Sequence, residues 1–173
     1  MKKILLILSL CIFIVACTRD KKEMLVNRWK ATHIENPQLD QMMKEQADFI
    51  DTLGKNNDPV TNERLYGVKN IDSMRKSLKM QLDTTRMIQD KMMQKTTFDF
   101  KSNNLAILNF GQGLDSAIWS LDNSGILILD EKPLKNSGGM VKMEILELSD
   151  TSLKLKYTEK GIATTATFHP EHK

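Results

Sequence analysis

Cys17 is the residue whose type and position most clearly predict chemistry in this chain. An uncharged apolar run, Ile4 to Val15, begins behind two lysines and ends at the small residue Ala16, directly before Cys17. The run is too short to cross a bilayer as a helix, which takes about 20 residues, but it has the length of a signal-peptide apolar region. We therefore expect residues 1–16 to be a signal peptide that is removed before Cys17.

The four residues Ile14-Val15-Ala16-Cys17 resemble the bacterial lipobox. The resemblance implies that the Cys17 thiol receives a diacylglyceryl group, that the bond before it is cleaved, and that the new amino group can take a further acyl chain such as palmitate. One acyl chain holds a protein to a membrane only marginally, whereas two or more hold it firmly. Residues 17–23 then form a lipidated tether. The alternative is a signal peptide that contains Cys17 by coincidence and is cleaved elsewhere.

The residues after Cys17 indicate where in the cell the protein is located. Lipoproteins that are retained in the enterobacterial inner membrane resemble one another in having aspartate directly after the lipidated cysteine. This chain has Thr18 at that position. Residues 18–23 are mixed and mostly basic, unlike the acidic cluster of surface-exported lipoproteins in Bacteroidetes-type bacteria. We expect a cell-envelope protein that is lipid-anchored in the outer membrane and faces the periplasm.

Charge and the other reactive residue types exclude several classes of protein. The formal charge is +3 and falls to about +1 without the two lysines of the signal peptide, so no basic field for nucleic acid is expected. His33, His169 and His172 lack zinc-ligand spacing. The serines of residues 116–124 lack a nucleophile-elbow context. We expect no enzyme activity, no metal and no cofactor.

The second half of the chain predicts short antiparallel strands. Alternating apolar and polar residues are interrupted by Gly, Asn and Asp about every 8–12 residues, which is typical of hairpins. The predicted strands are residues 24–35, 96–100, 105–110, 114–121, 126–132, 140–148, 152–160 and 162–170. Eight strands leave two unpaired edges unless they close. We therefore predict a mainly β domain (α+β overall) over residues 24–173, built as an eight-stranded antiparallel up-and-down barrel.

A helical insertion, about residues 38–94, separates the first two predicted strands. Apolar residues recur at helical spacing in two stripes, and Asn70 is placed to cap the second helix. The stripes are Leu39, Met42, Met43, Ile50 and Leu53, then Ile71, Met74, Leu78, Leu82, Ile88 and Met92. Methionine repacks easily, so one interpretation is a partner-binding face made of Met74, Met80, Met87 and Met92. The other is that the helices simply pack on each other and on the barrel.

The order of these features resembles the lipocalin-like lipoproteins common in Bacteroidetes. The resemblance is carried by Asn27-Arg28-Trp29-Lys30 in the first strand, by the segment 117–121 (AIWSL) and by the segment 145–155 (ILELSDTSLKL). It covers residues 24–36 and 95–169, without the helical insertion. It implies a lipocalin-like barrel that binds a small apolar ligand.

Two functions stay open at this stage. An eight-stranded barrel is either filled by its side chains or just wide enough for one small ligand. The candidate lining residues are Trp29, Phe98, Phe100, Trp119, Tyr157 and Phe168, some of which must instead plug the barrel. The alternative is a non-enzymatic protein that docks an envelope partner through the helical insertion.

Overall fold

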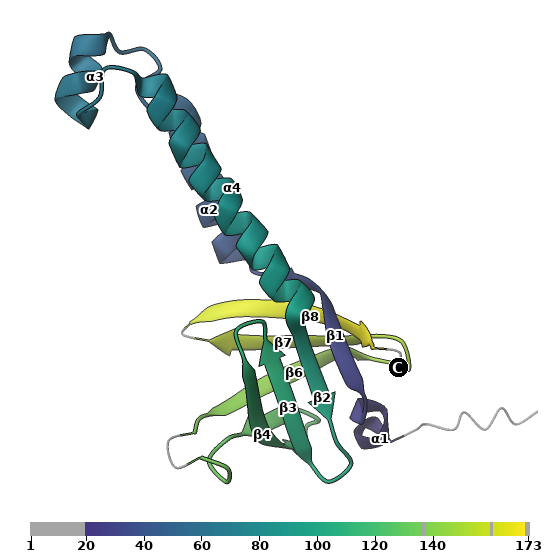
Figure 1. Cartoon of the computed structure of the whole chain (residues 1–173). Helices are drawn as coiled ribbons and strands as arrows, with labels where there is room; N and C mark the ends of the chain where they lie inside the picture. Colours follow the sequence, from purple (N-terminus) through teal and green to yellow (C-terminus); the bar gives the residue numbers. More distant parts are fainter. Residues whose placement is uncertain (1–19, 136–137, 160, 172–173) are drawn as a thin grey trace, which may run out of the picture.

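The computed structural model describes residues 20–135, 138–159 and 161–171 (Figure 1). Its centre is a closed antiparallel barrel in which each strand pairs with the next and β8 pairs with β1. The strands are β1 (Arg28–Glu35), β2 (Thr96–Phe100), β3 (Leu105–Phe110), β4 (Leu114–Leu121), β5 (Leu127–Asp130), β6 (Met140–Leu148), β7 (Leu153–Glu159) and β8 (Ile162–Pro170). The prediction of a closed eight-stranded antiparallel barrel with helices is confirmed.

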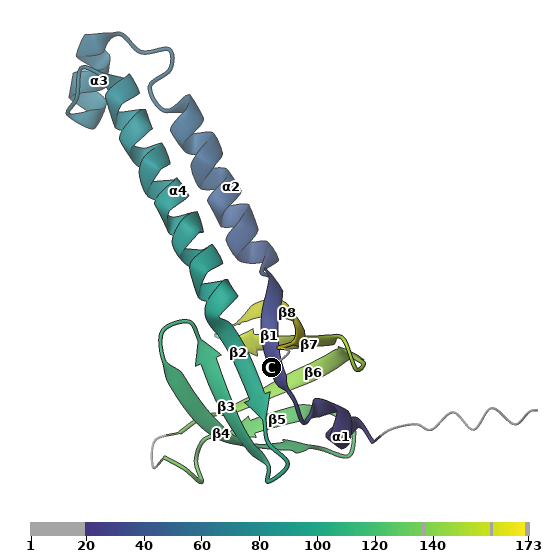
Figure 2. The same ribbon diagram turned by 45° about the vertical axis from the view of Figure 1, so that its right-hand side comes forward.

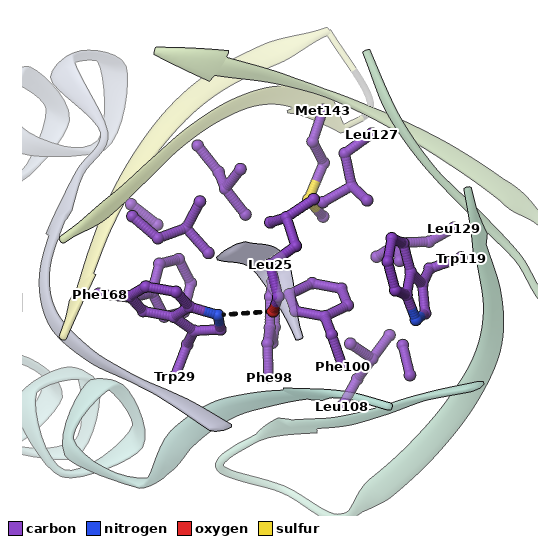
Figure 3. Close-up of a cluster of buried hydrophobic side chains, with 14 of the residues drawn as sticks. Leu25, Trp29, Phe98, Phe100, Leu108, Trp119, Leu127, Leu129, Met143 and Phe168 are labelled. Carbon is purple, nitrogen blue, oxygen red and sulfur yellow. Dashed lines mark hydrogen bonds between the residues drawn. The ribbon is translucent and has the colours of Figure 1, made fainter. Parts of the chain in front are cut away.

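The prediction that residues 24–35 form one strand was wrong at its beginning. Helix α1 (Lys21–Leu25) precedes β1, and the Asp20 carboxylate caps it by accepting a hydrogen bond from the Lys22 amide at 3.0 Å. Leu25 is fully buried in the barrel core. The carbonyl oxygen of Leu25 accepts a hydrogen bond from Trp29 Nε1 at 3.0 Å (Figure 3). Apolar burial of Leu25 thus overrides the strand propensity of this segment.

The end of the barrel nearest α1 is a packed core rather than a cavity. Five aromatic side chains of the barrel core are at most 2% exposed, namely Trp29, Phe98, Phe100, Trp119 and Phe168, and Trp29, Phe100 and Trp119 lie in this packed half. The rings of Phe100 and Trp119 meet edge to face with centroids 5.6 Å apart, a favourable aromatic arrangement. The Trp119 indole donates to the Lys101 carbonyl at 3.0 Å, so its polar atom is satisfied inside the protein. Figure 3 shows Leu25 among Trp29, Phe98 and Phe100, with Trp119 farther to the right.

The insertion between β1 and β2 forms a long helical hairpin, which we call the stalk (residues 37–95). It consists of α2 (Pro37–Thr52), the short α3 (Pro59–Tyr66) at the tip, and α4 (Ile71–Lys95). The 25 residues of α4 make a rod about 37 Å long at 1.5 Å per residue. Figures 1 and 2 show α2 and α4 side by side, projecting from the barrel end opposite α1.

The stalk is held together by a narrow apolar seam. Met43, Ile50 and Leu82 are buried between the helices, and Leu39, Ala47 and Leu78 pack against them. The predicted cap is confirmed, because the Asn70 side chain accepts from the Ser73 amide at 3.1 Å. Six members of the predicted stripes lie outside the seam, and two of these are largely exposed, Met42 at 57% and Ile88 at 49%. Helix α3 lies between the two predicted apolar stripes, where the sequence pattern predicted no helix.

Candidate functional site

The stalk end of the barrel is hollow. A cavity of about 1260 Å³ opens between the upper parts of β3 to β7, and a second of about 410 Å³ lies between the stalk base and the barrel. Met92, Phe110 and Tyr157 line both cavities. We therefore treat the two cavities as one site, the cup, with these three side chains at its waist.

The floor of the cup is apolar and comes from four successive strands. Leu108 of β3, Ala117 of β4, Leu129 of β5 and Met143 of β6 line the larger cavity, and all four are at most 3% exposed. Successive strand residues face opposite sides of a sheet, so the next inward position on β6 is Val141, which is 38% exposed. The apolar wall thus continues from the packed core toward the stalk end of the barrel, where no other side chains cover it within the described residues. An apolar wall of this kind favours an apolar guest.

Charged groups at the rim of the cup form a small network. Lys135 Nζ, in the β5–β6 connection, donates to Asp115 Oδ1 at the start of β4 and lies 4.0 Å from Glu131 Oε1. The Lys135 hydrogen bond, together with that from the Ser116 amide, lowers the pKa of Asp115, and the same contact raises the pKa of Lys135. Glu131 Oε2 also accepts from the Gly139 amide at 3.1 Å. These contacts tie the described ends of the β5–β6 connection to the rim.

Replacing Lys135 by alanine is expected to raise the pKa of Asp115 toward the ordinary aspartate value of about 3.9. The lysine is the largest cause of the lowered pKa. Because folding lowers the pKa of Asp115, the contact stabilises the native rim fully when the pH is above the ordinary aspartate pKa. This stabilisation is lost as the pH falls through the lowered pKa of the folded protein. Carboxyl chemical shifts followed by NMR during an acid titration would measure this. An unchanged Asp115 pKa in the variant would show that Lys135 is not its partner in solution.

The smaller cavity adds polar groups at the stalk base. His33, Asn36, Asp40, Gln89 and Asp90 line it beside apolar side chains of the barrel. The Asn36 side chain accepts from the Leu39 amide at 3.0 Å and donates to Thr164 Oγ1 at 3.4 Å. It therefore starts α2 and fastens the junction of β1 and α2 to β8. The cup is apolar below and polar where it meets the stalk.

The six predicted ligand-binding residues fall into two groups. Phe98, Phe168 and Tyr157 line the smaller cavity. Trp29, Phe100 and Trp119 lie in the packed half and line neither part of the cup. The sequence analysis did not identify Phe110 and Val141, which also line the cup. Both lie two residues beyond a buried inward position, which is the signal that could have found them.

The four methionines predicted to bind a partner are also separated. Met80 and Met87 are 64% and 48% exposed on α4, whereas Met74 is half-buried and Met92 lines the cup. Cys17, the signal peptide and His172 lie outside the described residues. Within the described part of the chain, no group of three or more His, Cys, Asp or Glu residues could hold a metal ion. No described helix is both long and apolar enough to cross a membrane.

The fold and the cup define the class of protein only structurally: a closed eight-stranded antiparallel barrel with an open apolar cup at one end and a helical stalk above it. No protein-family model matches the chain, and neither the curated proteins nor the solved structures yield a match to it.

Proposed function

We propose that this chain is a lipid-anchored cell-envelope protein whose lipocalin-like barrel binds a small apolar ligand in the cup. The supporting observation is the cup itself, which opens above a floor of Leu108, Ala117, Leu129 and Met143. Ligand pockets typically measure about 300–1,000 Å³ and combine an apolar lining with a few polar groups. The smaller cavity falls in that range and the larger one slightly exceeds it. The protein is a carrier or sensor in this proposal, not an enzyme.

The anchor in this proposal is diacylglyceryl-Cys17 in the outer membrane, facing the periplasm. Asp20, the first described residue, caps α1, and α1 lies at the barrel end opposite the stalk (Figure 1). A tether that reaches this end holds the packed half of the barrel nearest the membrane. The cup then opens away from the bilayer, toward ligands arriving from the aqueous side.

Native mass spectrometry of the protein extracted from its own membrane in mild detergent tests both parts of the proposal. The intact mass reports whether Cys17 carries lipid. We expect a further small-molecule mass in a one-to-one ratio, bound without a covalent bond. A lipidated chain that never carries a small molecule, and that binds no apolar naphthylamine dye, would contradict the ligand proposal.

A charge placed in the cup is expected to weaken apolar binding at least tenfold. Val141→Glu puts a carboxylate on the cup wall, where an apolar guest would have to desolvate it. Val60→Glu is the matched control, because Val60 is 74% exposed on α3 at the stalk tip. Titration of the naphthylamine dye by fluorescence measures both affinities. Equal affinities in the two variants would place the dye outside the cup.

The second candidate function is docking of an envelope protein through the stalk. Large apolar side chains that stay exposed on the described helices favour it, among them Met42, Phe49, Met80 and Met87, since such surfaces often mark interaction sites. Replacing residues 38–94 by a short Gly-Ser bridge joins β1 to β2 directly and tests it. If the barrel folds and the cell phenotype persists without the stalk, docking through the stalk is excluded.

A further inference from the structure

The two broad sides of the stalk differ in charge at the positions that directly flank the seam. Six residues form the seam between α2 and α4: Leu39, Met43, Ala47, Ile50, Leu78 and Leu82. Each residue that directly follows a seam residue is charged, and these are Asp40, Lys44, Asp48, Asp51, Lys79 and Asp83. Each residue that directly precedes one is uncharged and exposed, and these are Gln38, Met42, Gln46, Phe49, Ser77 and Gln81.

These two sets lie on opposite sides of the hairpin. One residue is about 100° of helical rotation, so the residues before and after a seam position point to either side of it. Asp51 and Lys79, which both follow seam residues, form an ion pair across the helices with an N–O distance of 2.5 Å. Residues that follow the seam therefore meet on one side, which we call the charged side. Those that precede it meet on the other, the uncharged side.

The same ion pair fixes which residues of α2 lie opposite which residues of the antiparallel α4. Asp51 of α2 lies opposite Lys79 of α4. Because the helices are antiparallel, each residue back along α2 matches one residue forward along α4. Met42 therefore lies opposite Ile88, and Phe49 lies opposite Gln81. Ile88 is six residues after Leu82, about 120° before it in rotation, and so faces the uncharged side. Met42, Phe49 and Ile88 are 57%, 59% and 49% exposed. The uncharged side thus presents three large apolar side chains among Gln and Ser, with no cover from the described chain.

We propose that the uncharged side of the stalk is the contact between two copies of this chain. It rests on the second candidate function, docking through the stalk, and names the partner. A two-fold axis along the stalk brings each level against the same level of the second copy, with α2 facing α4. Met42 then packs on Ile88 of the second copy, and Phe49 lies over Gln81 of the second copy. The result is a four-helix bundle with antiparallel neighbours.

Charge and area both fit a second copy. Helix α2 carries four carboxylates and one lysine, whereas α4 carries six basic and three acidic residues. Each pairing of α2 with α4, within one copy or between two, therefore sets a helix of net charge −3 beside one of net charge +3, with most of these charges outside the uncharged side. The helices, about 24 and 37 Å long and about 10 Å wide, offer on the order of 600 Å² per copy. About 1,200 Å² in total is the lower bound for a stable interface.

The arrangement also agrees with a common anchor. Figure 2 shows α1 of the single chain at the barrel end away from the stalk. A two-fold axis along the stalk keeps both barrels at the same end of the bundle, so α1 of both copies would lie at that end. Two chains fixed in one membrane meet this condition without bending. Confinement to one surface raises their effective concentration, which supports a dimer with an interface of this modest size.

The first test is the mass of the full chain extracted in mild detergent, measured by native mass spectrometry and sedimentation equilibrium. We expect a dimer, and Phe49→Glu is expected to weaken it at least tenfold. Val60→Glu is the matched control, since Val60 is 74% exposed on α3 at the stalk tip, outside the uncharged side. A dimer that withstands Phe49→Glu would overturn the assignment of this face.

Cross-linking in intact membranes keeps the test independent of whether a variant folds well in detergent. Gln46→Cys places a thiol on the uncharged side, and Lys44→Cys places one on the charged side of the same helix turn. Because the two α2 helices are diagonal in this bundle, a short bis-maleimide cross-linker is used, and it is expected to give a covalent dimer from Gln46→Cys at several times the yield from Lys44→Cys and from the unmodified chain. Equal yields would overturn the proposal.

The outcomes also separate this proposal from the docking function beneath it. If the extracted complex contains one copy of this chain and a different polypeptide, and Phe49→Glu abolishes that association, the dimer proposal is overturned. Docking through the stalk is then retained as the function. A chain that runs alone in detergent and forms no cross-link in the membrane overturns both.

Discussion

Substitution of Trp29 by alanine is expected to lower the free energy of unfolding by about 3–5 kcal/mol, the usual cost of removing a buried tryptophan. Trp29 has no exposed surface, and its indole holds the Leu25 carbonyl at 3.0 Å. The change removes core volume and also frees α1 from the barrel end that it closes. Urea unfolding followed by far-ultraviolet circular dichroism measures the loss.

A graded pair of variants separates the two contributions of Trp29. Trp29→Phe keeps most of the ring but leaves the Leu25 carbonyl without its donor, so we expect a smaller loss of about 1–3 kcal/mol. Met80→Ala changes an exposed side chain and is expected to stay within about 0.5 kcal/mol of the unmodified protein. If Trp29→Ala cost no more than Met80→Ala, the packed half would not be the stabilising core.

Gly111→Ala is the change that we expect to disturb the junction of barrel and stalk most. Gly111 has a φ of +83°, and an added Cβ would lie 2.7 Å from the Met92 carbonyl oxygen and 2.8 Å from its Cα. Both atoms are backbone at the last turn of α4, which cannot move aside without shifting the stalk. We expect a loss of about 2–4 kcal/mol from strain and overpacking together.

Gly67→Ala is the matched control for this change. Gly67 has a φ of +74°, but nothing lies within 4 Å of the position of an added Cβ. It therefore carries the backbone strain alone, about 1–2 kcal/mol. Because Met92 lines both cavities of the cup, Gly111→Ala should also weaken dye binding and Gly67→Ala should not. Equal losses in stability would show that the contact of Gly111 with Met92 is not maintained in solution.

The barrel could be predicted from the sequence because its information is local. Five strands, from β2 to β4 together with β6 and β8, have the bounds that alternation and turn residues predict. The turns fall on residues that tolerate positive φ, such as Asn104 and Gly125. Helix α1 could not be predicted, because its cause is distant: the apolar side chain of Leu25 fills the barrel end beside Trp29.

The cup was harder to predict for a physical reason. All inward positions of a strand look alike in sequence, whether they end in the packed core or at an open wall. Trp119 and Tyr157 both belong to inward series, yet Trp119 is fully buried and Tyr157 lines the cup. What distinguishes them is which barrel end α1 closes. In the stalk, likewise, the stripe containing Met42 is wider than one neighbouring helix can cover.

The direct fusion of stalk and barrel has a consequence for the order of folding. Only Asn36 separates β1 from α2, and β2 begins at the residue after α4 ends. Arg28 and Asp99, which pair across β1 and β2, would otherwise have to close a long loop at a large entropic cost. Helices form locally within about a microsecond, and their pairing along the seam brings the two strands together in register. We expect the stalk to form first and to template the β1–β2 pair, so the helical hairpin shortens the search that a barrel of non-local strands would otherwise make slow.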